Sequence, residues 1–178
     1  MKSGDIVLCR SNGLIGAGIR FAQRRMRKHY LNSPIPGAGD KWWRWNHVAV
    51  LNTNVGNGQW TIYQAEAKGV TDYRLLSTVA PGGEYTVIPL PDHVDRDMFL
   101  KFLSTQVEKR YGFLSILSCF VDMILPDAIC LRRSDTWICS GLVAAGLWFA
   151  GFSGAFVWPD MYTVVPAEIA EACSAKAI

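Results

Sequence analysis

At 178 residues the chain is long enough for one well-filled domain and short for two, and a content of 50% hydrophobic and 19% charged residues excludes a disordered protein. The net charge of +3 is too small to indicate a specific nucleic-acid partner. Five cysteines form no C-x-x-C pair, and their odd number argues against a disulfide framework. We therefore expect a single domain over residues 1–178, with free thiols and with no metal or other cofactor.

The beginning of the chain turns polar at Cys9 and Arg10, before an apolar run reaches the length of a signal peptide. Residues 138–158 carry no charged side chain and are numerous enough to span a bilayer, but glycines interrupt this run and residues 151–154 resemble a loop. We expect neither a signal peptide nor a transmembrane span, and a cytoplasmic or phage- or host-associated protein.

Residues 4–9 predict a first strand, and residues 14–28 predict an amphipathic helix with a basic face. That face is either a solvated helix surface or a contact for an anionic polymer or a membrane surface. After a loop rich in proline and glycine, three tryptophans are either core anchors or an exposed wall that stacks on a substrate. The basic residues are Arg20, Arg24, Arg25, Arg27 and Lys28, and the tryptophans are Trp42, Trp43 and Trp45.

Residues 46–51 and 59–67 predict two strands of a hairpin that turns near Val55 and Gly56. This register places His47 across from about Gln64, and Glu66 shares the face of Gln64 because the two are separated by two positions. Residues 69–70 break the second strand, and residues 85–90 predict a further strand. Together the strands predict an antiparallel meander.

Asp92 or Asp95 caps a predicted helix that runs to about Arg110, and residues 113–125 predict a second apolar helix. A third helix includes Cys139, with Asp135 or Thr136 as its N-cap and an apolar, buried body that extends to Phe149. Residues 164–171 predict a short final helix that starts with a proline.

Cys139 thus falls in the first turn of a buried helix, where unpaired backbone N–H groups and the helix dipole stabilise a thiolate. A thiol nucleophile needs a base, and the base needs a third group that fixes its tautomer. His47 is the only histidine with a strand position and a polar partner, either Gln64 or Glu66, across the hairpin. The alternatives are an inert core cysteine and a structural histidine.

The run Cys139-Ser140-Gly141-Leu142-Val143 resembles the nucleophile motif of the NlpC-type papain-like cysteine hydrolases. Because His47 precedes Cys139, the order resembles the circularly permuted branch that includes the YaeF/YiiX-like amidases and the lecithin retinol acyltransferase relatives. Further segments that are similar to that branch are Gly4 to Leu8, Asn46 to Val50, Gly69-Val70, Tyr111-Gly112 and Tyr162 to Ile169.

The resemblance implies an α+β, permuted papain-like fold in which a small antiparallel sheet or half-barrel packs on helices. It implies a peptidase or amidase with a peptide or acyl substrate, peptidoglycan peptides first, and an acyltransferase or lipid esterase second. Tyr111, Ser140 and Trp45 are candidates for oxyanion or substrate binding. The usual glutamate position of the family falls on Gln64, and Glu66 follows two residues later. A binding protein that has kept the fold without turnover is the remaining alternative.

Overall fold

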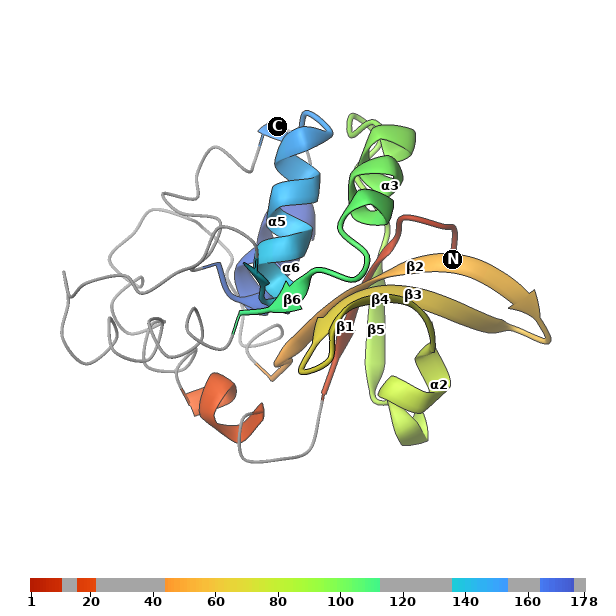
Figure 1. Ribbon diagram of the computed structural model, residues 1–178, viewed down its shortest axis with the longest axis vertical. Helices are drawn as coiled ribbons and strands as arrows, with labels where there is room; N and C mark the ends of the chain where they lie inside the picture. The colour runs from red at the N-terminus through yellow and green to blue at the C-terminus, as the bar shows by residue number, and fades with distance from the viewer. Residues whose placement is uncertain (11–15, 22–43, 113–135, 154–163, 175–178) are drawn as a thin grey trace, which may run out of the picture.

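The computed structural model describes residues 1–10, 16–21, 44–112, 136–153 and 164–174 (Figure 1). Residues 16–21 are helical. The other elements, in chain order, are β1 (Ile6–Cys9), β2 (His47–Gly56), β3 (Gln59–Glu66), β4 (Gly69–Leu75), α2 (Leu76–Val79), a 3-10 turn (Pro81–Gly83), β5 (Tyr85–Ile88), α3 (Arg96–Thr105), β6 (Arg110–Tyr111), β7 (Thr136–Trp137), α5 (Cys139–Phe149) and α6 (Pro166–Ser174).

The protein is α+β, with a five-stranded antiparallel sheet in the order β4-β3-β2-β1-β5. Helices α3, α5 and α6 lie on one side of the sheet and α2 lies on the other (Figure 1). The predicted neighbours hold for β1, β2 and β3, whereas β4 takes the place beside β3 and β5 lies on the far side of β1. The short strands β6 and β7 form a separate parallel pair.

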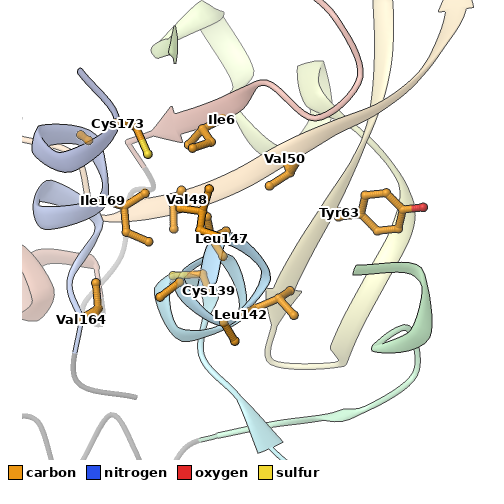
Figure 2. Packing of buried hydrophobic residues seen from close by; sticks show 14 of the residues in the cluster. Ile6, Val48, Val50, Tyr63, Cys139, Leu142, Leu147, Val164, Ile169 and Cys173 are labelled. Carbon is orange, nitrogen blue, oxygen red and sulfur yellow. The ribbon is translucent and has the colours of Figure 1, made fainter. Parts of the chain in front are cut away.

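Each face of the sheet covers its own apolar cluster because side chains alternate along a strand. Val48 and Val50 of β2 point toward Leu142 and Leu147 of α5, as Figure 2 shows. On the opposite face, the buried residues are Val7, Cys9, Ala49, Leu51, Trp60 and Ile62, and Leu76 of α2 packs on them. Helix α5 therefore lies directly on the strand that begins with His47.

The hairpin between β2 and β3 is longer than predicted. Both strands continue as an exposed ribbon to Gly56 and Gln59, and the turn consists of Asn57 and Gly58. Both turn residues have positive φ angles, 51° and 72°, as a two-residue type I′ turn requires. The predicted turn at Val55 and Gly56 was wrong. The polar residues before it stay in β2 although this part of the strand projects beyond the core into solvent.

Strand β4 is a correction to the sequence prediction, in which Gly69 and Val70 only break the preceding strand. Gly69 has a φ of 111°, and a Cβ atom there would lie 2.6 Å from the carbonyl oxygen of Lys109. The Val70 N–H donates to this same oxygen at 2.8 Å. The glycine thus allows the start of β4 to approach the segment that leads into β6.

Two predicted helices have different boundaries from those expected. Helix α3 is capped by Asp95, as one of the two alternatives predicted, but it ends at Thr105, and Arg110 belongs to β6. Helix α5 begins at Cys139 itself with Ile138 as its N-cap, because Thr136 belongs to β7; the predicted Thr136 cap was wrong, and Asp135 lies outside the described ranges.

Phe149 at the end of α5 is 46% exposed, so its predicted burial was also wrong. The final helix, α6, starts with a proline at position 166 as predicted. The predicted helix over residues 113–125, and most of that over residues 14–28, lie outside the described ranges. Within those ranges no helix has both the length and the apolar character needed to cross a bilayer.

Candidate active site

Cys139 is the first residue of α5 and is 5% exposed. The backbone N–H groups of Val48 and Ser140 donate hydrogen bonds to its sulfur. Burial alone would raise the pKa of the thiol, but the charge of His47, a hydrogen bond with the His47 side chain and the two backbone N–H groups together lower it below the ordinary value of 9.0. The surroundings of Cys139 thus favour a thiolate.

His47 is the first residue of β2 and is partly buried. Its Nε2 atom lies 2.9 Å from Oε1 of Gln64, so Nδ1 is the nitrogen left for the hydrogen bond with Cys139. Burial lowers the pKa of His47, but the charge of Cys139, the hydrogen bonds with Cys139 and Gln64 and the charge of Glu66 outweigh it and raise this pKa above 6.5. Both shifts favour a thiolate–imidazolium pair.

The two candidates for the third group have different partners. Gln64 is 1% exposed and contacts His47 directly. Glu66 instead forms an ion pair with Arg74, with 3.5 Å between Oε1 and the guanidinium nitrogen, and acts on His47 only through its charge. Continuing the pairing of Val50 with Tyr63 places Glu66 opposite His47 and Gln64 on the diagonal. The diagonal neighbour therefore makes the contact.

Ser140 follows Cys139 in α5, and Tyr111 is close enough for the charge of Cys139 to act on its hydroxyl. Burial and the charge of Cys139 raise the pKa of the Tyr111 hydroxyl well above its ordinary value, so this hydroxyl stays protonated and remains a donor. Ser140 is 2% exposed and contributes its backbone N–H to the sulfur. Both residues can therefore supply hydrogen bonds to a reacting group at Cys139.

Trp45 is a core anchor. Its side chain is 3% exposed and belongs to the cluster beneath α5, while the Arg44 guanidinium lies 4.4 Å from the centre of its ring. The substrate-stacking alternative is therefore wrong for Trp45. Trp42 and Trp43 lie outside the described ranges, as do Arg24, Arg25, Arg27 and Lys28 of the basic face; Arg20 lies in helical residues 16–21.

The sequence did not indicate two contributors to this arrangement. The Val48 N–H is a backbone group with no side-chain signature. Arg74, the ion-pair partner of Glu66, lies on the unpredicted strand β4. The β-rich alternation of residues 70–75 was the signal that could have found this strand. Among the described residues no cluster of three histidine, cysteine or acidic side chains is placed to bind a metal ion.

A scan against models of known protein families finds no match for this chain, and a search of curated proteins finds none either.

Proposed function

We propose that the protein is a cysteine hydrolase of the peptidase or amidase type, with Cys139 as nucleophile, His47 as general base and acid, and Gln64 as the group that orients His47. The observation that carries the proposal is that His47 is bonded on one side to a thiol at a helix N-terminus and on the other to a buried amide oxygen. An inert core cysteine has no need of either contact.

The reaction would begin when the Cys139 thiolate attacks the carbonyl carbon of an amide. The new C–S bond forms as the carbonyl π electrons move to oxygen. Imidazolium His47 then gives its proton to the leaving nitrogen, and the C–N bond breaks to leave an acyl-thioester. A water molecule, deprotonated by His47, attacks this thioester, and cleavage of the C–S bond releases the acid and restores the ion pair.

The oxyanion formed in both steps would be held at the start of α5. The first intrahelical bond of α5 is donated by Leu142 to Ile138, so the N–H groups before Leu142 are not used by the helix backbone. The Cys139 N–H is one of these groups, and the protonated Tyr111 hydroxyl is a second donor near the sulfur. The helix dipole favours negative charge at the same place.

The finer fold assignment rests on the same residues. A five-stranded antiparallel sheet that carries the histidine, packed on a helix that starts with the cysteine, is what a permuted papain-like fold requires, with the histidine first in the chain. We therefore propose this fold, with peptides, those of peptidoglycan first, as the substrates to test.

The test is the reactivity of Cys139 toward iodoacetamide near neutral pH, with each cysteine followed by mass spectrometry. Cys139 should be alkylated faster than Cys9, Cys119, Cys130 and Cys173, because its lowered pKa supplies thiolate where ordinary thiols are protonated. A panel of activated esters and peptide amides then tests turnover.

Cys139→Ala should abolish hydrolysis while the fold is kept, since alanine is well accommodated at a helix start. The matched control is Cys173→Ala in α6, which removes a buried thiol from a helix that carries none of the proposed groups and should leave hydrolysis unchanged. Hydrolysis retained by Cys139→Ala would disprove the assignment of the nucleophile.

A further inference from the structure

Two buried polar atoms next to the proposed site have no hydrogen-bond partner in the part of the chain that the structure describes. They are Nε2 of Gln64 and Oγ1 of Thr71. Gln64 is 1% exposed and Thr71 is 6% exposed, so neither atom reaches bulk solvent. Buried donors and acceptors without partners are costly and uncommon, which means that each of them calls for an explanation.

The two residues face each other across the sheet. Gln64 of β3 and Thr71 of β4 are a registered pair in the antiparallel ladder, and directly opposed residues have side chains on the same face with neighbouring Cβ atoms. An amide N–H is a donor only, and a threonine hydroxyl can accept. The two atoms are therefore chemically complementary neighbours.

A bulge in β4 places Arg74 on the same face as Thr71. Ile62 pairs with Arg74 and Gln64 pairs with Thr71, so the single residue Tyr63 on β3 is opposed by two residues on β4. Without the extra residue, strand alternation would place Thr71 and Arg74 on opposite faces. With it, Arg74 reaches Glu66 while Thr71 reaches the side of Gln64.

We propose that Thr71 is a positioning residue for the cysteine–histidine pair: one water molecule bridges its hydroxyl to the free N–H of the Gln64 amide, and so holds the amide oxygen on His47. This inference rests on the proposed roles of Cys139 and His47. Thr71 is not one of the reacting groups, and it acts only through Gln64.

The direction of the hydrogen bonds follows from the charge state of His47. An imidazolium carries hydrogen on both nitrogens, so Nε2 must donate and Gln64 must present its oxygen. The amide N–H group then points away from the ring and requires an acceptor. If the amide rotated by half a turn, its N–H would face a ring N–H, and the neutral tautomer with hydrogen on Nδ1 could not take the proton of the thiol.

Thr71→Val tests the proposal, because valine keeps the β-branched shape and removes only the hydroxyl. The measured quantity is the thiolate fraction of Cys139 against pH, taken as the ultraviolet absorbance of each variant minus that of the same variant with Cys139→Ala. This titration needs no substrate. If the wild type shows a lowered Cys139 midpoint but hydrolyses no substrate, the proposed function fails, and the titration of the Thr71 variants still tests the role of Thr71.

We expect Thr71→Val to move the Cys139 midpoint upward by about half to one pH unit, a roughly three- to tenfold loss of thiolate on the acid side. Thr71→Ser should restore the wild-type midpoint, because it returns the hydroxyl. In a Gln64→Ala background, Thr71→Val should cause no further shift, since the two residues act in one chain.

A midpoint unchanged in Thr71→Val, or an equal shift with and without Gln64, would overturn the proposal. A purely structural role for Thr71 would lower the unfolding midpoint in urea without moving the titration. If Thr71→Val fails to fold, Thr71→Ala provides the same removal of the hydroxyl with less bulk, and the same two outcomes apply.

Discussion

Removing the Gln64 side chain should damage the proposed reaction much more than removing that of Glu66. Gln64→Ala deletes the oxygen that lies 2.9 Å from Nε2 of His47, and a hydrogen bond to a charged group contributes about 1.5 to 3 kcal/mol. Since about 1.4 kcal/mol is a factor of ten in rate, kcat/KM should fall by roughly 10- to 150-fold.

Glu66→Ala is the matched control from the same strand face. Its carboxylate is about a quarter exposed and is bound to Arg74, and such partly exposed ion pairs contribute about 0 to 1 kcal/mol. The loss of its charge lets the pKa of His47 fall somewhat, so we expect less than about a fivefold decrease in kcat/KM.

The assay is kcat/KM across the pH range for both variants on the best ester or amide of the panel, with urea unfolding as a check on the folded fraction. Gln64 is 1% exposed, so its truncation also leaves a void, and rates must be compared at equal folded protein. Equal losses in the two variants, or a larger loss from Glu66→Ala, would refute the assignment of Gln64 as the orienting group.

Three further predictions concern pH and stability. In the wild type, the plot of kcat/KM against pH should be bell-shaped. Its acid limb, where Cys139 takes up a proton, should lie below pH 9.0, and its alkaline limb, where His47 loses a proton, should lie above pH 6.5. A profile that rises only near pH 9.0 would contradict the ion pair. Gly146→Ala should destabilise the fold by about 1 to 2 kcal/mol in urea unfolding, because the new Cβ atom would lie 2.6 Å from the fully buried ring of Phe99, and overpacking of this kind outweighs the roughly 1 kcal/mol gain in helix propensity. Asp95→Ala should cost about 1 kcal/mol in the same experiment, since its carboxylate accepts a backbone N–H in the first turn of α3; no change would mean that the cap is not used.

Sequence patterns located the elements that carry the site. Strand alternation predicted β1, β2 and β3. Cys139 was singled out because it begins a helix, and His47 because it begins a strand. These signals are local, because burial on one face imposes a period on the sequence. The boundaries were harder: Thr136 looks like an N-cap, but pairing between β6 and β7 takes it into a strand.

The choice between Gln64 and Glu66 could not be made from spacing alone. Both lie on one face of β3, and the outcome depends on Arg74, which a bulge in a neighbouring strand turns toward Glu66. Bulges are two-for-one mismatches between strands, and a single strand's pattern does not show them. The burial of Trp45 likewise depends on which residues pack over it, and a run with three tryptophans does not show this.

Because Cys139 and His47 belong to different layers, the lowered pKa of the Cys139 thiol exists only while the sheet and α5 are docked. In an unfolded chain this pKa would return to its ordinary value of 9.0, so denaturation near neutral pH would reduce the thiolate at Cys139. Burial raises the pKa of Cys9 and of Cys173 to about 12, and these thiols would become more acidic on unfolding. Denaturation would therefore change the acidity of thiols within one chain in opposite directions, and a rise in the pKa of Cys139 would report that α5 has separated from the sheet.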